Sequence, residues 1–546
     1  MDPKIICRWC GTMLLLCAGL PIGGAEPELA APPWLDPSGI RGSLVIVGGG
    51  SMADEIRHRV VELAGGKAAR LVLIPTASET AEPTLADPKR LSLYLEPWKA
   101  LGVADIQVLH TRSRETANEV AFSEPIKRAT GIWFGGGDQS KIADAYLGTA
   151  VEREITALLS RGGVVGGTSA GAAIQSKVMI AGGRTQPLIG VGFDLLPSAI
   201  IDQHFVARQR KERLIAAVHA NPACVGYGID EGTALIVRGR KLEAIGKSTV
   251  TIVLAASAGR PLRELELKNG ERHDLTMLRR AALERSLGNF PPAKPALPEV
   301  NGGALVIVGG GTLPREITEK FIELAGGPDA PIVVLPIAAG DTLTGDTAND
   351  TRLFDRAGAK HVKSLRARTR AETEDVAFLE ALKNAKGVWF GGGRQWRFVD
   401  AYANTPVEGL LRDVLKRGGV IGGSSAGASI QGQYMPRGSA LGNEEMMAEG
   451  YERGLGFLPG VAIDQHFTQR KRQGDMTALM SRYPQLLGIG IDEGTALIVQ
   501  GQRGDVLGKN GVHFYDYRSG PPPGERDYAL LKAGQRFDLA LRKVMD

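Results

Sequence analysis

The chain contains two copies of one long sequence pattern, and this repeat constrains the fold more than any other feature. Four blocks recur in the same order: LVIVGGG at Leu44–Gly50 and Leu305–Gly311, GIWFGGG or GVWFGGG at Gly131–Gly137 and Gly387–Gly393, DQHF at Asp202–Phe205 and Asp464–Phe467, and GIDEGTA at Gly228–Ala234 and Gly490–Ala496. The offset between copies stays at about 260 residues, which is the size of a whole domain rather than of a solenoid unit.

A proline-rich segment, Asn289–Pro298, separates the two copies. Such segments are extended and semi-rigid. We therefore predict a first domain over residues 40–288, a linker over 289–301 and a second domain over 302–546.

The first 25 residues resemble a signal peptide. Lys4 and Arg8 provide positive charge, Met13–Leu20 is apolar, and Gly23–Ala25 offers small residues for cleavage. We expect residues 1–25 to be removed and the protein to be exported to the periplasm or secreted. An uncleaved anchor is the alternative. Cleavage would leave Cys224 as the one cysteine, which excludes an internal disulfide.

The composition gives no indication of a nucleic-acid or membrane partner. The net charge of +5 is modest for 546 residues, and no basic run is interleaved with aromatic residues. Beyond the N-terminal segment, no apolar stretch is long enough for a membrane span. The eight histidines show no metal-ligand spacing, so we expect no metal and no cofactor.

Short apolar strands alternate with amphipathic helical segments within each copy. In copy 1 we predict strands at Ser43–Val47, Leu71–Ile74, Ile106–Leu109, Gly131–Phe134 and Gly163–Val165, and a helix at Ser51–Leu63. Apolar strands alternating with helices indicate α/β domains with doubly wound parallel sheets, covered by helices on both faces. Gly48–Gly50 lacks the spacing of a dinucleotide-binding loop and is interpreted as a tight turn at a strand end.

The segments Gly166–Gly171 and Gly422–Gly427 have the pattern of a nucleophile elbow. Each follows a predicted strand, opens a helix of small residues and places a serine, Ser169 or Ser425, in the turn. The N–H of the next residue, Ala170 or Ala426, is the expected oxyanion donor. A turn of small residues formed for packing alone is the alternative interpretation.

Each copy also places one histidine in the repeated DQHF block. His204 and His466 are candidate general bases for the two serines. Arginines follow each histidine, and their planar guanidinium groups bind carboxylates in bidentate geometry, so we expect an anionic substrate. A buried structural histidine and an ordinary charged helix are the alternatives.

Together these blocks resemble the cyanophycinase family of serine peptidases, which is related to peptidase E and has a class I glutamine amidotransferase-like fold. The resemblance implies a Ser–His–Glu triad and hydrolysis of cyanophycin, a polyaspartate carrying arginine on its side-chain carboxyls, to β-aspartyl-arginine dipeptides. The substrate-binding residues implied in copy 1 are Gln139, Asp202, Gln203, Arg208, Arg210 and Arg213. Those implied in copy 2 are Gln395, Asp464, Gln465, Arg470 and Arg472.

The two copies differ in the acid that could complete the triad. Copy 1 has no glutamate between Ser169 and His204, whereas copy 2 has Glu444 and Glu445 between Ser425 and His466. Copy 2 in turn has Asp475 at the position of Arg213. We therefore expect Glu444 or Glu445 to orient His466, with copy 2 performing the chemistry and copy 1 binding substrate or acting slowly.

The sequence thus predicts an exported cyanophycinase-like serine peptidase whose two copies pack as an intramolecular pseudo-dimer. A peptidase for other aspartyl or isoaspartyl peptides, and a catalytically impaired binding protein, are the alternatives.

Overall fold

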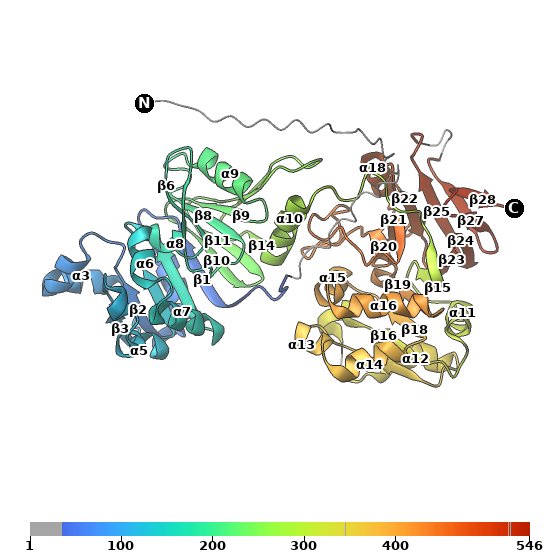
Figure 1. Cartoon of the computed structure of the whole chain (residues 1–546), viewed down its shortest axis with the longest axis horizontal. Coiled ribbons are helices and arrows are strands. Elements are labelled where there is room, and N and C mark those ends of the chain that lie inside the picture. The colour runs from blue at the N-terminus through green and yellow to red at the C-terminus, as the bar shows by residue number, and fades with distance from the viewer. Residues whose placement is uncertain (1–34, 344, 522–523, 525) are drawn as a thin grey trace, which may run out of the picture. The chain divides into compact units, whose positions relative to one another are not determined.

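Strand β1 (Ile40–Val47) lies inside a sheet that is covered on both faces. Leu44 and Ile46 belong to one apolar cluster, whereas Val45 and Val47 belong to another on the opposite face. This alternation is that of a strand buried on both sides, as the sequence predicts. The structure is a computed structural model that describes residues 35–343, 345–521, 524 and 526–546 (Figure 1), so the predicted signal peptide lies outside the described residues.

The main sheet of copy 1 has the strand order β14-β11-β10-β1-β5-β4-β2-β3. Strands β1 to β5 are parallel, as predicted, and β10, β11 and β14 extend the sheet in antiparallel fashion. The remaining strands of this sheet are β2 (Arg70–Ile74), β3 (Asp105–Val108), β4 (Gly131–Phe134), β5 (Val164–Thr168), β10 (Thr233–Gly239), β11 (Lys241–Gly246) and β14 (Arg272–Asp274).

A second, smaller sheet in copy 1 has the order β13-β12-β9-β8 and stands beside a two-stranded hairpin. Its strands are β8 (Ala199–Gln203), β9 (Val225–Ile229), β12 (Val250–Leu254) and β13 (Arg263–Leu267), and the hairpin is β6 (Val178–Gly182) with β7 (Leu188–Val191). The helices are α1 (Asp54–Leu63), α2 (Ala81–Ala86), α3 (Pro88–Lys99), α4 (Arg114–Ala117), α5 (Val120–Arg128), α6 (Gln139–Tyr146), α7 (Ala150–Ser160), α8 (Ala170–Ala173), α9 (Lys211–Ala220) and α10 (Leu275–Leu287).

Copy 2 repeats this plan with a main sheet of order β17-β16-β18-β19-β15-β23-β24-β27-β28 and a second sheet β20-β21-β22-β25-β26. The main-sheet strands are β15 (Val300–Val308), β16 (Ile332–Leu335), β17 (Val362–Ser364), β18 (Gly387–Phe390), β19 (Val420–Ser424), β23 (Thr495–Gly501), β24 (Arg503–Gly508), β27 (Arg536–Asp538) and β28 (Lys543–Met545). The second sheet contains β20 (Gly432–Tyr434), β21 (Leu458–Gln465), β22 (Leu487–Ile491), β25 (Gly511–Asp516) and β26 (Ala529–Lys532).

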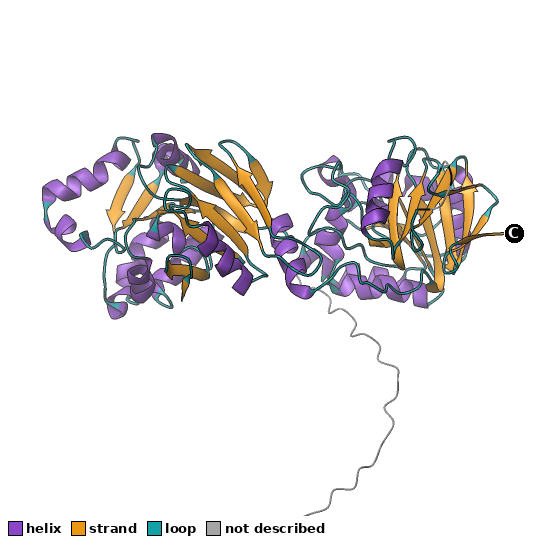
Figure 2. Cartoon of the chain, turned by 90° about the horizontal axis from the view of Figure 1, so that it is seen from above, coloured by secondary structure: helices purple, strands orange, loops and turns teal. Residues whose placement is uncertain are grey.

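The helices of copy 2 pack around these sheets in the same way as those of copy 1, and Figure 2 shows helices and strands alternating through both copies. They are α11 (Arg315–Ala325), α12 (Ala348–Arg356), α13 (Arg370–Thr373), α14 (Val376–Asn384), α15 (Trp396–Tyr402), α16 (Pro406–Lys416), α17 (Ala426–Ser429) and α18 (Gln473–Arg482). Among the described residues, no helix is both long and apolar enough to cross a membrane.

The linker packs against copy 2 instead of standing free. Phe290 is buried and stacks on Tyr434, with 6.1 Å between ring centroids. Gln485 Nε2 donates to the carbonyl of Pro292 at 3.2 Å. Strand β15 already begins at Val300, within the predicted linker.

Candidate active site

Both elbow serines have the backbone conformation that a nucleophile elbow requires. Ser169 has φ 54° and ψ −109°, and Ser425 has φ 57° and ψ −113°, a region that non-glycine residues adopt only where the surroundings enforce it. The turn is tight because a Cβ on Gly167 would lie 2.3 Å from the carbonyl oxygen of Gly171. Small residues are therefore required around the serine, as the sequence predicts.

Each serine is hydrogen-bonded to the histidine predicted for it, and each histidine to a glutamate. In copy 1 Ser169 Oγ lies 2.9 Å from His204 Nε2, and His204 Nδ1 lies 2.5 Å from Glu231 Oε1. In copy 2 the corresponding distances are 2.9 Å and 2.6 Å, and the carboxylate belongs to Glu493. This is the geometry of a nucleophile, a general base and an acid that orients the base.

These contacts correct the sequence-based assignment of the acid. Glu444 and Glu445 do not supply the carboxylate on His466 Nδ1, which comes from Glu493. Copy 1 does not lack an acid, because Glu231 occupies the same place. A missing acid therefore does not distinguish copy 1, which was expected to bind substrate or act slowly, from copy 2, which was expected to perform the chemistry.

The smaller sheet explains why the acid follows the histidine in the chain. Strands β8 and β9 are adjacent and parallel, with Gln203 paired to Ile229, so the residues after both strands meet at one edge. His204 follows β8 and Glu231 follows β9 by two residues. The signal in the sequence is the repeated GIDEGTA block, which carries Glu231 in copy 1 and Glu493 in copy 2.

The glycine triplets provide space for the histidine and the glutamate. A Cβ on Gly49 would lie 2.3 Å from the His204 ring, and a Cβ on Gly50 would lie 2.8 Å from the Glu231 side chain. Gly310 and Gly311 stand in the same relation to His466 and Glu493. The repeated glycines thus allow the backbone after the first strand to pass directly under the base.

The expected oxyanion donors lie at the start of short helices beside the serines. Ala170 and Ala426 are the first residues of α8 and α17, where N–H groups precede any intrahelical acceptor. The backbone of Gly136 lies against Ser169, since a Cβ placed on Gly136 would be 3.4 Å from the serine Cβ.

Burial and neighbouring arginines lower the pKa of both histidines. Burial has the largest effect on His204, Arg208 and Arg210 lower its pKa further, and Glu231 opposes them. Burial, followed by Arg470 and Arg472, also lowers the pKa of His466, and Glu493 opposes this shift. Each imidazole is therefore neutral at pH 7 and able to accept a proton.

We expect the acidic limb of kcat/KM for copy 1 to lie below the usual histidine pKa of about 6.5. A lowered pKa keeps the base neutral to lower pH, so activity is lost only below the shifted value. Arg208→Gln should move the limb upward, because it removes a charge that lowers the His204 pKa. The measurement is a pH profile of the Ser425→Ala chain, and a limb at or above 6.5 before the Arg208 change would contradict this account.

Other predicted binding residues support the pocket from within. Asp202 is buried and binds Arg213, with 2.9 Å from Nε to Oδ2, and Gln203 accepts from Arg210. Gln139 Nε2 donates to the carbonyl of Ile180 at 2.7 Å, and Gln395 Nε2 donates to that of Pro436 at 2.8 Å. These residues fix the segments that surround the serine.

Copy 2 keeps the buried guanidinium of copy 1 but takes it from another segment. Arg437 Nε donates to Asp464 at 3.1 Å, and Arg437 also binds Asp475, which stands at the position of Arg213. Arg472 donates to the same Asp464 at 2.8 Å. The apparent loss of an arginine in copy 2 is thus compensated, a feature that the sequence comparison missed.

Arg437→Ala should destabilise the protein by about 3 kcal/mol, because it removes one partner of a buried ion pair. Adding Asp475→Arg should restore much of this stability by recreating the arrangement of copy 1. Chemical denaturation of the wild-type, single and double variants gives the measurement. Equal destabilisation in the single and double variants would show that the two arrangements are not equivalent.

A cavity of about 200 Å³ opens onto Ser425. It is lined by four arginines, two glutamines, one asparagine, one glycine and the serine: Arg394, Arg437, Arg470, Arg472, Gln395, Gln465, Asn443, Gly393 and Ser425. Gln465 Oε1 is buried without a hydrogen-bond partner among the described residues, so it can accept a bond from a ligand. A cavity with this lining favours an anionic ligand that also carries N–H donors.

Arg208 and Arg470 occupy equivalent exposed positions four residues after the histidines. Within the part of the chain that the structure describes, neither guanidinium has a hydrogen-bonded partner, in contrast to Arg213 and Arg472, which bind aspartates. Both are therefore available to a substrate carboxylate. Among the same residues no group of three or more metal-ligating side chains lies together.

A serine–histidine–glutamate site on an α/β sheet defines a class of serine hydrolases. The model of peptidase family S51 matches residues 44–245 and 305–507. The cyanophycinase of Geminocystis herdmanii is 35% identical over 226 residues, which cover 39% of this chain and 81% of that protein. The cyanophycinase of Trichormus variabilis is 30% identical over 270 residues, which cover 45% and 89%.

A crystal structure of a peptidase from an acI-B1 Actinobacterium is 26% identical, covers 43% of this chain and 98% of that chain, and has a TM-score of 0.36. The two matched regions together make up well over half of the chain. The chain therefore belongs to peptidase family S51, and it is a serine-type peptidase with two copies of the family domain.

Proposed function

We propose that this chain hydrolyses cyanophycin to β-Asp-Arg dipeptides, and that both copies do so. The similarity to cyanophycinases and the complete triad in each copy support this proposal. The observation that carries most weight is the arginine-lined cavity on Ser425, because every arginine attached to cyanophycin presents a free carboxylate.

The proposed reaction is acyl transfer to the elbow serine. Ser Oγ attacks the peptide carbonyl as its proton passes to His Nε2, and the carbonyl oxygen accepts bonds from backbone N–H groups. The protonated histidine then gives its proton to the leaving amine. Water, deprotonated by the same histidine, attacks the acyl-serine and regenerates Oγ–H. Glu231 or Glu493 holds the imidazole and stabilises its positive charge.

Arg208 and Arg470 are the proposed carboxylate anchors in the two copies, because their guanidinium groups are exposed close to the triads. In copy 2, Gln465 Oε1 is the proposed acceptor for an N–H donor of the same substrate. We also propose that cleavage releases dipeptides from a chain end and that the two copies pack as an intramolecular pair.

Export to the periplasm or the medium is a further part of this proposal. It is supported by the charged, apolar and small-residue regions of residues 1–25. Expression of the full chain in a bacterial host, followed by N-terminal sequencing of the extracytoplasmic fraction, tests it. Recovery of the protein inside the cell with its first 25 residues still attached would refute it.

The test of function is incubation of the purified protein with cyanophycin and with isoaspartyl dipeptides. The proposal predicts release of β-Asp-Arg from cyanophycin, detected by mass spectrometry. Cleavage of isoaspartyl dipeptides without release of β-Asp-Arg would instead identify a peptidase for other isoaspartyl substrates. A Ser169→Ala, Ser425→Ala chain is the control for contaminating activity.

A further inference from the structure

The segment Pro436–Gly454 of copy 2 differs most from its counterpart in copy 1. In copy 1 the equivalent region is the β6–β7 hairpin, whose side chains Leu188, Ile189 and Val191 are exposed. In copy 2 the segment has no regular strands beyond an isolated bridge and is largely buried. We name Pro436–Gly454 the pocket segment, because Arg437 and Asn443 line the cavity at Ser425.

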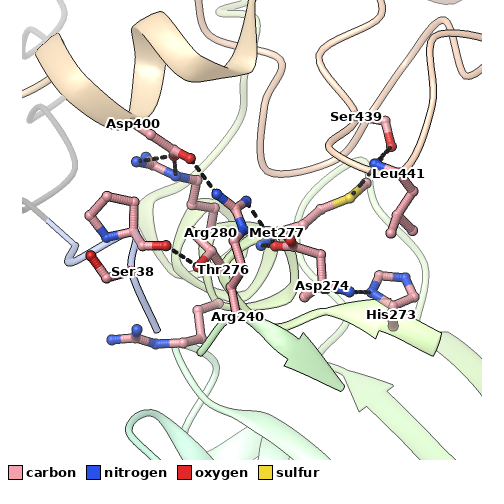
Figure 3. Close-up of polar contacts among 12 residues, drawn as sticks. Ser38, Arg240, His273, Asp274, Thr276, Met277, Arg280, Asp400, Ser439 and Leu441 are labelled. Atoms are coloured by element: carbon pink, nitrogen blue, oxygen red, sulfur yellow. Dashed lines mark hydrogen bonds and ion pairs between the residues drawn. The ribbon is translucent and has the colours of Figure 1, made fainter. Parts of the chain in front are cut away.

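Helix α10 of copy 1 lies directly against the pocket segment. A Cβ on Gly450 would be 2.6 Å from the carbonyl oxygen of Met277 and 2.8 Å from the backbone nitrogen of Ala281. Ser439 Oγ lies 3.7 Å from Met277 Sδ, as Figure 3 shows, and Met277 belongs to the main apolar cluster of copy 2. The backbones of α10 and the pocket segment are therefore in direct contact.

Arginines of copy 1 bind the acidic residues of the pocket segment. Glu449 accepts from Arg285 at 2.5 Å and from Arg263 at 3.0 Å, and its carboxylate lies 3.2 Å from Arg260. Arg260 also donates to Glu452 at 2.7 Å. The three arginines lower the pKa of Glu449 and keep it charged. One further ion pair has its arginine in the pocket segment and its acid in copy 1: Arg453 donates to Glu284 of α10 at 2.8 Å.

Asp400 joins copy 1 to the helix that begins beside the pocket. Asp400 lies on α15, a helix that begins immediately after Arg394 and Gln395. It accepts from Arg240 at 2.7 Å and from Arg280 at 3.2 Å, both from copy 1 (Figure 3). Tyr451 of the pocket segment donates to the same carboxylate at 2.8 Å. Asp400 is buried, so these partners are needed to offset the cost of its charge.

Two arginines that line the cavity, Arg394 and Arg437, are hydrogen-bonded to the pocket segment. Arg394 donates to the carbonyls of Ser439 and Gly442, and Ser439 is the residue that contacts Met277. Arg437 donates to the carbonyl of Asn443 at 3.2 Å and to Asp464 at 3.1 Å. Contacts made by copy 1 therefore continue, residue by residue, to the lining of the cavity.

We propose that copy 1 positions the substrate pocket of copy 2, with Arg280 as a positioning residue that acts through Asp400 and Tyr451. Copy 1 thus has two roles, its own triad and the support of the neighbouring pocket. The kinetic part of this inference rests on the proposed function. Because Arg280 does not line the cavity at Ser425 and is bonded to Asp400 instead of the triad, its loss should weaken substrate binding in copy 2 and leave the chemistry of Ser425 intact.

The test is Arg280→Gln in a full chain that also carries Ser169→Ala, so that only copy 2 is active. We expect KM for cyanophycin to rise roughly five-fold or more, the range of typical coupling between sites, with kcat nearly unchanged. Arg279→Gln on the same helix is the matched control, because the Arg279 guanidinium donates to the carbonyl of Asp36, which precedes copy 1, and not to copy 2. The activity of copy 1, measured in a Ser425→Ala chain, should not respond to Arg280→Gln.

Two further measurements separate positioning from a folding defect and from a wrong substrate. In the double variant Arg280→Gln, Asp400→Asn, the KM increase should be smaller than the product of the single increases, because the two changes remove one interaction. Hydrogen exchange of residues 437–453 should accelerate in Arg280→Gln but not in Arg279→Gln, whatever the substrate. Unchanged hydrogen exchange in Arg280→Gln, or an equal fall in the activity of both copies, would overturn the inference. Faster exchange in a protein that does not hydrolyse cyanophycin would refute only the proposed substrate.

Discussion

A chain with Ser169→Ala should retain the activity of copy 2, and a chain with Ser425→Ala should retain that of copy 1. The reason is that each serine has its own histidine and its own glutamate within hydrogen-bonding distance. The double variant should lose activity by about 10⁶-fold in kcat, the effect expected when the nucleophile of a triad is removed. Dipeptide release by the three variants gives the measurement.

The two single variants also rank the copies. Loss of nearly all activity in one of them would show that a single copy carries the reaction, despite the matching geometry. Circular dichroism and denaturation midpoints of all variants are the control, since alanine in a strained turn can alter folding as well as chemistry.

Glu231→Gln in a Ser425→Ala chain, and Glu493→Gln in a Ser169→Ala chain, should each lower kcat by roughly 10³–10⁴-fold. An amide cannot stabilise the imidazolium that forms when Oγ is deprotonated, and it favours the wrong tautomer of the histidine. Steady-state kinetics on dipeptide release provides the measurement. In the Glu493→Gln chain KM should change little, because Glu493 does not line the cavity found at Ser425.

Glu444→Gln and Glu445→Gln are matched controls for the second prediction. Both residues lie between the serine and the histidine in the chain, but the carboxylate on His466 belongs to Glu493. Neither control should reduce kcat by more than a few-fold. A large loss in Glu445→Gln together with a small one in Glu493→Gln would restore the original sequence-based assignment.

The sequence is sufficient to predict the parallel half of the main sheet of copy 1 and the pairing of Ser169 with His204. Strand β4 runs from Gly131 to Phe134 as predicted, because four buried apolar residues between turn signals leave little choice. The predicted helix Ser51–Leu63 begins three residues later, at Asp54, and the strand at Gly163–Val165 continues to Thr168. The antiparallel extension and the second sheet depend on long-range pairing that local patterns do not encode.

The missed parts of the site share one physical cause. Glu231 reaches His204 only because β8 and β9 pair in parallel, and this pairing is not visible in the order of residues along the chain. Arg437 replaces Arg213 from a different segment, so a position-by-position comparison reports a loss where the buried charge is conserved. In both cases the fold, and not the spacing in the sequence, decides which side chains meet.

The central claim is that one chain carries two complete serine triads, and active-site titration tests it most directly. The purified protein would be treated with a fluorophosphonate and its mass measured intact, followed by peptide mapping. We predict two adducts per chain, on Ser169 and Ser425, with one adduct remaining in each Ser→Ala variant. A single adduct at saturation, or none on either serine, would contradict the account.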